Sequence, residues 1–296
     1  RGGGFTDADL DAKLRELGYD IAKFKQIMSS KEVADRLKAD SEEAQSYGVM
    51  YTPMVFINGV ELRGYRAPQA LTRAIDLLSA SNPKPGSALD DHPPTAITKY
   101  LDDWRYQTRA PMPQSVRFWP SNATDPMNSR VRIDVFGDYQ DQNSNELDVA
   151  VRALHEKYPD VTYVFHSFPF DQACNSVVAR TVNPKGCRAA RAAEAAGVLG
   201  GDAAYWKMHA WLMANRETFS DDSLRAAAPS MGLDADALIG AMDGPAAAAG
   251  LARELAGAKA LNVTQLPMLF INGRFVPRWK LDTESVLPQL VELAGK

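Results

Sequence analysis

The sequence contains few cysteines, no long apolar run and no excess of positive charge, and each shortage excludes a class of protein. Its 296 residues include two cysteines, too few for a cysteine-based metal site. No run approaches the roughly 20 apolar residues that span a bilayer, and a net charge of −4 argues against nucleic acid as a partner. Since it also lacks a glycine-rich phosphate loop and a nucleophile elbow, we expect no cofactor and no metal.

What the chain does contain is one stretch that occurs twice. The residues at 52–59 (TPMVFING) return at 266–273 as LPMLFING, 214 positions later. An apolar run that follows a proline and ends in Asn-Gly predicts a strand entering a tight hairpin, with a second short strand after it. Proline cannot donate to a β-ladder and therefore belongs at the start of the strand, where it is a candidate cis proline.

The repeat extends well beyond this motif. At the same offset, without a gap, further identical pairs are Leu10 and Leu224, Gly18 and Gly232, Asp20 and Asp234, Met28 and Met242, Leu37 and Leu251, and Val49 and Val263. Two copies of one unit of about 75 residues or more are therefore present, and a period of this length indicates tandem domains rather than a solenoid.

Helical patterns surround the hairpin of the first copy. Three helices are expected before it, beginning near Thr6, residue 21 and Ser30. The third should turn three apolar side chains inward, namely Val33, Leu37 and Ala44. A further helix over residues 68–78 would close the unit.

A proline-rich segment, residues 81–130, separates this unit from the rest of the chain. One helix, from residue 95 to about 107, is expected to interrupt it. We interpret this helix as a spacer that docks on a domain, and binding of a partner by the same helix is the alternative.

The second copy begins with additional elements. Alternating apolar residues predict strands at 131–136 and 161–165, and a helix at 145–158 lies between them. This order favours a parallel strand pair with a right-handed crossover. Two alanine-rich helices, 187–199 and 203–215, should precede the repeated elements.

This order of elements resembles the thioredoxin fold in its DsbA-like form. Residues 135–140 are similar to the first strand of that family and its approach to the active-site turn. Other similar positions are Phe168-Pro169, Trp206, Met208-His209 and Ala214-Asn215. The resemblance implies an α/β fold, a thioredoxin-like sheet with a helical insertion. It implies a complete domain at 131–296 and the C-terminal half of another at 1–80, joined by the connector 81–130.

The chemistry of that family resides in a Cys-x-x-Cys turn at the start of the first helix, where the helix N-terminus activates a thiolate. Here the four positions are Asp141, Gln142, Asn143 and Ser144. Without the cysteines this turn cannot cycle through a disulfide, so we expect the second domain to be redox-inactive there. Asp141 is interpreted as a helix N-cap; an acid–base role would need partners that the sequence does not identify.

The first copy lacks the strand–helix–strand that precedes its repeat in the second copy. Half a thioredoxin-like domain cannot pair its hairpin or cover its apolar face alone. We expect the other half before Arg1, or from another molecule by swapping. It could carry an intact Cys-x-x-Cys, because Thr52 and Pro53 keep the pair that the family places opposite an active dithiol. Leu266 and Pro267 have lost the hydroxyl, and all four are candidate polypeptide-binding residues.

The two cysteines, Cys174 and Cys187, lie in a context similar to a bacterial DsbA-like subgroup, with Cys-Asn and a later Gly-Cys. The resemblance implies a disulfide that pins the inserted loop to its helix, contributing about 3 kcal/mol. An electron-passing pair and free thiols are the alternatives. A disulfide would place the protein in an oxidising compartment, the periplasm or the outer face of a bacterial cell. Anchoring through a membrane segment outside this chain is left open.

The histidines are scattered along the chain. His92 and His155 are expected to be solvated, and His209 to be packed in a core. His166 should lie near the active-site end of the second strand, without an identifiable acid or nucleophile partner.

Two classes of function remain. The first is an extracytoplasmic thiol-disulfide oxidoreductase whose working dithiol lies before Arg1. The second is a non-catalytic binding or chaperone-like module, which is favoured for this chain by itself. Both imply protein or peptide substrates, and the first leaves room for a membrane redox partner.

Overall fold

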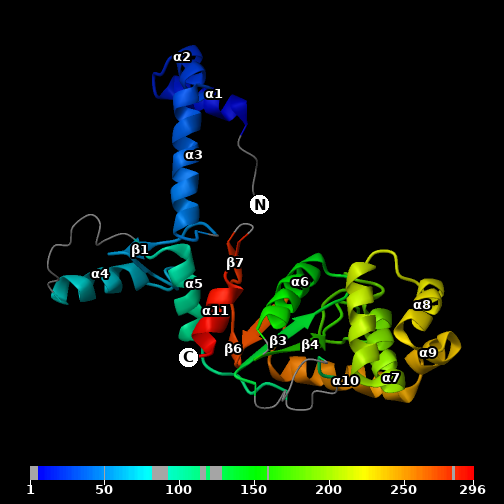
Figure 1. Cartoon of the computed structure of the whole chain (residues 1–296). Coiled ribbons are helices and arrows are strands. Elements are labelled where there is room, and N and C mark those ends of the chain that lie inside the picture. Colours follow the sequence, from blue (N-terminus) through cyan, green and yellow to red (C-terminus); the bar gives the residue numbers. More distant parts are fainter. Residues whose placement is uncertain are drawn as a thin grey trace. The chain divides into compact units, whose positions relative to one another are not determined.

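The computed structural model describes residues 6–49, 51–81, 93–113, 118–120, 129–158, 160–281 and 284–296. The chain divides into two compact units, residues 1–99 and 100–296, and each is described by itself (Figure 1). The division falls inside the segment that we predicted as a connector. Across the described ranges, none of the helices combines the length and apolar character that a membrane crossing requires.

The first unit consists of helices around one short hairpin. Its elements are α1 (Asp7–Glu16), α2 (Ile21–Met28), α3 (Lys31–Ser46), β1 (Phe56–Ile57), β2 (Val60–Glu61) and α4 (Ala70–Ser81). The first three helices begin where a polar N-cap side chain accepts a hydrogen bond from a backbone N–H, at Thr6, Asp20 and Ser30. The hairpin is confirmed, although its strands are shorter than predicted.

Helix α5 (Ala96–Arg105) confirms the helix predicted within the connector. Its residues 96–99 belong to the first unit, where Lys99 forms an ion pair with Glu61. Its residues 100–105 belong to the second unit, where the indole nitrogen of Trp104 donates to the carbonyl of Ile271 at 3.3 Å. The boundary between the two units therefore lies within this helix.

A four-stranded sheet forms the centre of the second unit, in the order β4–β3–β5–β6. The strands are β3 (Val131–Gly137), β4 (Val161–Ser167), β5 (Met268–Ile271) and β6 (Arg274–Phe275). Strands β3 and β4 are parallel and joined by α6 (Gln142–Lys157), which confirms the predicted parallel pair and the helix between its strands. Helix α6 begins at Gln142 rather than Asn145, because the Asp141 side chain caps it.

The remaining elements of the second unit are mostly helical. They are α7 (Gly186–Ala214), α8 (Asp221–Ala227), a 3-10 turn (Ala228–Met231), α9 (Ala235–Met242), α10 (Pro245–Ala260), a short hairpin of β7 (Lys280–Leu281) and β8 (Glu284–Ser285), and α11 (Leu287–Ala294). The two helices predicted at 187–199 and 203–215 are confirmed as the two segments of α7, which meet at a kink where Gly201 has a non-helical φ of 67°. The α/β class and thioredoxin-like fold are thus confirmed.

The structure repeats along with the sequence. Helices α2 and α9, and likewise α3 and α10, have bounds that match at the offset of 214 residues. Both hairpins have the same register, since Phe56 pairs with Glu61 and Phe270 pairs with Phe275. The asparagine at each turn, Asn58 and Asn272, adopts positive φ (48° and 50°), as a tight hairpin turn requires.

The two copies differ in burial. We predicted that Val33, Leu37 and Ala44 on α3 would face inward, but α3 has no buried residue and Leu37 is 64% exposed. In the second copy, the matched Leu251 on α10 is only 3% exposed. Helical periodicity identified the apolar face correctly, but in the described part of the first unit no sheet or long helix covers it.

Candidate functional site

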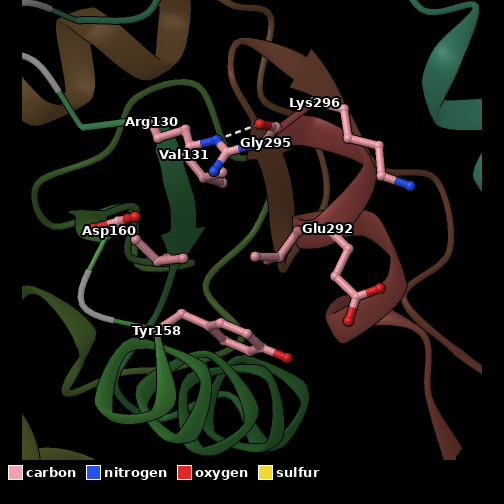
Figure 2. Close-up of a pocket in the computed structure, with 9 residues that line it drawn as sticks. Arg130, Val131, Tyr158, Asp160, Glu292, Gly295 and Lys296 are labelled. Carbon is pink, nitrogen blue, oxygen red and sulfur yellow. Dashed lines mark hydrogen bonds between the residues drawn. The ribbon is translucent and has the colours of Figure 1, made fainter.

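The sheet of the second unit has a hollow at one end and the predicted site at the other. The hollow, of about 420 Å³, lies where β3 and β4 begin (Figure 2). It is lined by Arg130, Tyr158 and residues of α11, and the Arg130 side chain donates to the carbonyl of Gly295. Arg130 lies just before β3, whereas the turn at residues 141–144 lies after the end of β3. The hollow is therefore separate from the candidate site.

The candidate site lies where β3 ends. Phe136 is paired with Met268 in the antiparallel β3–β5 ladder, so extending the register by one residue places Pro267 beside Gly137. The Leu266–Pro267 bond is cis, as is the matched Thr52–Pro53 bond in the first unit. A Cβ on Gly137 would lie 2.7 Å from the Phe165 ring, which explains why glycine stands there. The turn at 138–144 and the cis-proline loop are therefore neighbours.

Asp141 and Ser144 are the residues that we predicted at the positions of the family's two cysteines. The Asp141 carboxylate accepts hydrogen bonds from the Ser144 backbone N–H (2.6 Å) and from its hydroxyl (2.8 Å). The Ser144 oxygen in turn accepts from the Asp138 N–H at 3.2 Å, and the side chain is fully buried. Within the described chain no histidine is hydrogen-bonded to this pair. The pair caps the helix and has no group that can exchange a disulfide.

The two middle positions of the turn face outward. Gln142 and Asn143 are exposed in the first turn of α6, and Gln142 donates to Glu146 at 3.1 Å. Glu146 also forms an ion pair with Lys280 of β7. These contacts stabilise the helix surface and bring no reactive group to the turn.

The buried Asp138 joins the turn to the inserted loop, which is the segment between β4 and α7 (residues 168–185). Its carboxylate accepts from the N–H of Gln140 (2.9 Å), the N–H of Phe170 (2.8 Å) and the amide of Asn183 (2.8 Å). Burial raises the pKa of Asp138 above its ordinary value, and these hydrogen bonds only partly oppose that shift. Gln140 also accepts from the N–H of Lys185, so both ends of the loop are fixed to the turn.

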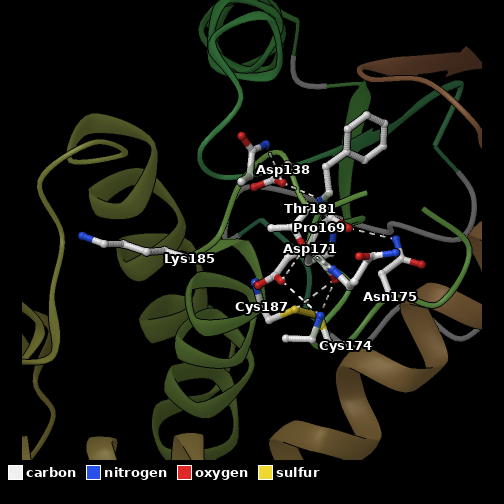
Figure 3. The surroundings of a disulfide bond; sticks show 12 residues. Asp138, Pro169, Asp171, Cys174, Asn175, Thr181, Lys185 and Cys187 are labelled. Atoms are coloured by element: carbon white, nitrogen blue, oxygen red, sulfur yellow. Dashed lines mark hydrogen bonds between the residues drawn. A yellow bond between two sulfur atoms is a disulfide. The ribbon is translucent and has the colours of Figure 1, made fainter. Parts of the chain in front are cut away.

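A disulfide between Cys174 and Cys187 closes the inserted loop (Figure 3). Asp171 lies beside it; its side chain accepts from the N–H of Ala173 at 3.1 Å and from the N–H of Cys187 at 3.4 Å. Cys187 lies in the first turn of α7 and is 8% exposed. The disulfide and these hydrogen bonds therefore hold the loop in place beside the start of α7.

An apolar hollow of about 330 Å³ lies between this loop and the chain that leads to Pro267. Its lining includes Phe168, Phe170, Val178, Val182, Val263 and Thr264, with Arg180 as the charged member. Val182 is 53% exposed. The backbone groups at 264–266 form no hydrogen bond with any other residue that the structure describes. An apolar hollow beside unpaired backbone is suited to an extended polypeptide.

The histidines are placed differently from our predictions in two cases. His166 has acid partners after all: its ring nitrogens lie 3.0 Å from Asp134 and 2.7 Å from Glu254. His155 is buried rather than solvated, with Nδ1 against the carbonyl of Val161. His92 lies outside the described residues.

His209 is packed as predicted, within a buried polar network. Its Nε2 lies 2.8 Å from Asp148, and its Nδ1 lies 3.2 Å from the hydroxyl of Tyr139. Burial opposes ionisation of Asp148, but His209 and Arg152 outweigh burial and lower the pKa of Asp148. Asp134, Asp138 and Asp148 were not predicted from the sequence, although an aspartate inside or directly after an apolar strand was an available signal for the first two.

The described residues contain no group of three or more histidine, cysteine or acidic side chains arranged to hold a metal ion.

A family profile and two curated proteins match this chain. The profile described as "DSBA-like thioredoxin domain" matches residues 1–76 and 132–283. Two curated relatives, the Na(+)/H(+) antiporters NhaA 1 of Salinispora arenicola and NhaA 3 of Salinispora tropica, are 29% and 28% identical over 149 residues, which is 50% of this chain. The chain spans only 21% of the length of either.

Three solved structures resemble this chain at low sequence identity. Alpha-DsbA2 from Wolbachia pipientis is 20% identical with a TM-score of 0.47, covering 67% of this chain and 92% of that one. BdbD from Bacillus subtilis is 16% identical with a TM-score of 0.47, covering 61% and 97%. MdbA from Corynebacterium diphtheriae is 20% identical with a TM-score of 0.46, covering 66% and 98%. Since the profile matches well over half of its residues, this chain belongs to the DSBA-like thioredoxin domain family.

Proposed function

We propose that the second unit is a polypeptide-binding module that does not exchange disulfides at its turn. The observation that carries this proposal is the Asp141–Ser144 pair beside an intact cis-proline loop. The pair removes the reactive sulfurs, while the surface next to them keeps an apolar hollow and unpaired backbone. Membership of the family supports descent from thiol-disulfide oxidoreductases. The site supports binding of a polypeptide without disulfide exchange.

The bound polypeptide would lie extended along residues 264–266. Backbone hydrogen bonds to such an edge are independent of sequence, and adjacent pockets select the side chains. The hollow next to Val182 would accept an apolar side chain, and Arg180 at its rim would favour an acidic neighbour. The preferred substrates are therefore unfolded segments with apolar and acidic residues.

The test is binding of fluorescently labelled, reduced and carboxymethylated α-lactalbumin, an unfolded probe without thiols, measured by fluorescence anisotropy. Val182→Asp places a charge in the hollow and should weaken binding at least about tenfold, equivalent to about 1.4 kcal/mol. Val198→Asp, on α7 and also exposed (40%), is the matched control and should bind like wild type. Equal affinity of both variants, or no binding by wild type, would contradict the proposal.

The second candidate is an oxidoreductase whose working dithiol lies in a segment outside this chain. Thr52 and Pro53, which retain the pair expected opposite an active dithiol, favour it. Insulin reduction by a longer gene product, abolished by changes in a Cys-x-x-Cys that precedes the first unit, would support it. A longer product without any such motif would exclude it.

We also propose an extracytoplasmic location in a bacterium. The Cys174–Cys187 disulfide supports this, because such bonds persist in oxidising compartments. The match to proteins named as antiporters supports a membrane attachment outside this chain. Thiol trapping in fractionated cells should find Cys174 and Cys187 oxidised and the protein at the membrane; free thiols in the cytosolic fraction would refute it.

A further inference from the structure

The helices of the first unit expose an apolar face that is buried in the second unit. We define the first-unit face as Leu17, Tyr19, Met28 and Leu37, which are all exposed. Met28 is 48% exposed, whereas its counterpart Met242 is 0% exposed. Leu37 and Leu251 differ in the same way, at 64% and 3%. The matched residues are identical and lie on corresponding helices, so the difference in exposure must come from the elements that pack against them.

Two groups of elements cover the repeated part of the second unit. Helix α7 packs against α9 and α10, the counterparts of α2 and α3. Strand β3 pairs with β5, the counterpart of β1, so that Ile133 opposes Ile271. Figure 1 shows α7 alongside α10. All of these covering elements fall within residues 129–218.

In the hairpin of the first unit, the outer edge of β1 is not paired with any strand among the described residues. Among the described residues, β1 pairs with β2 alone, whereas β5 lies between β3 and β6. An unpaired strand edge next to an exposed apolar face is a template for another strand. Phe56 and Ile57 are half-buried, while Phe270 and Ile271 are almost fully buried. The edge and the face are therefore exposed together.

We propose that the first-unit face and the free edge of β1 bind a segment similar to residues 129–218 of the second unit. This segment has a strand, a helix and a second strand, followed by a helix rich in small residues. The incoming strand would run antiparallel to β1, as β3 does to β5. Buried alanines on α7, such as Ala189 and Ala193, let that helix approach closely, and the incoming helix needs the same property. A second copy cannot supply its own 129–218 segment, because that segment is already paired within its own second unit.

The repeat fixes how this occupant can be supplied. Phe219 and Phe5 are matched at the offset of 214 residues, so Thr218 can be joined directly to Phe5 without a linker. The resulting spliced chain carries residues 129–218 followed by residues 5–296. If the proposal holds, amide hydrogen exchange in α2 and α3 should slow at least about 100-fold relative to the original chain. Binding of the apolar dye ANS should fall as the face is covered.

A matched pair of variants separates covering from unrelated effects. In the original chain, Leu37→Lys should leave the urea midpoint unchanged, while Leu251→Lys lowers it. In the spliced chain both should lower it. Unchanged exchange in α2 and α3 of the spliced chain, or a Leu37→Lys variant that is still neutral there, would overturn the proposal.

The original chain decides the question even if the spliced chain does not fold. Its α2 and α3 amides should exchange at least about 100-fold faster than those of α9 and α10. Equal protection, or a dimer in light scattering that Leu37→Lys dissociates, would show that the face is already covered and would overturn the proposed occupant. Coexpression of residues 129–218 as a separate chain then distinguishes a partner in trans, which copurifies, from a covalently linked segment, which alone protects the face.

Discussion

The buried His166 makes the stability of the second unit dependent on pH. It is 2% exposed, and its ring lies between Asp134 on β3 and Glu254 on α10. Burial lowers the pKa of His166, but the two carboxylates outweigh burial and raise it to about 9, from an ordinary 6.5. Because one pKa unit corresponds to about 1.4 kcal/mol, protonated His166 contributes at most about 3 kcal/mol to folding.

The sign follows from the direction of this shift. A group whose pKa is higher in the folded protein contributes its full stability below its unfolded pKa and loses it as pH rises through its folded pKa. The free energy of unfolding should therefore fall by about 3 kcal/mol from pH 6.5 to slightly above pH 9. Above that range His166 is neutral in both states and contributes no further slope.

Urea unfolding followed by tryptophan fluorescence measures this directly, because all five tryptophans lie in the second unit. The variant His166→Gln cannot titrate and should lose the slope between pH 6.5 and 9. His155→Gln, also buried, is the matched control and should retain it. A wild-type stability that is flat over this range, or a slope that persists in His166→Gln, would refute the reasoning.

Three other perturbations test the supports of the candidate site. Replacing Cys174 and Cys187 by serine should lower the unfolding free energy by about 3 kcal/mol in urea titrations, and an unchanged midpoint would deny the loop its role. Asp138→Ala leaves buried donors of the loop unpaired and should cost about 2–3 kcal/mol, with faster amide exchange at Phe170. Gly137→Ala would press a methyl group against an aromatic ring and should cost about 1–3 kcal/mol in thermal unfolding; a neutral result would show that the ring can move away.

The repeated motif made much of the fold predictable. Hairpins depend on a few adjacent residues, and Asn-Gly after an apolar run specified both turns and their register. The strand–helix–strand was equally readable because its signals are local. The start of the helix after the first strand was also readable, because Asp141 is the N-cap that we predicted.

The partners of buried polar groups could not be predicted in the same way. Glu254 lies 88 residues further along the chain than His166, and only the packing of α10 on the sheet brings them together. The prediction that Leu37 would be buried was wrong for a different reason. A periodic pattern states which side of a helix is apolar, but not whether any other element covers that side.

We propose that the second unit, which belongs to the DSBA-like thioredoxin domain family, cannot exchange disulfides at the turn over residues 141–144. Insulin reduction by dithiothreitol, followed by turbidity with chain 1–296 as the catalyst, tests it most directly. Wild type should not accelerate the reaction, and Asp141→Cys combined with Ser144→Cys should do so. Acceleration by wild type that Asp141→Ala or Ser144→Ala abolishes would contradict the claim.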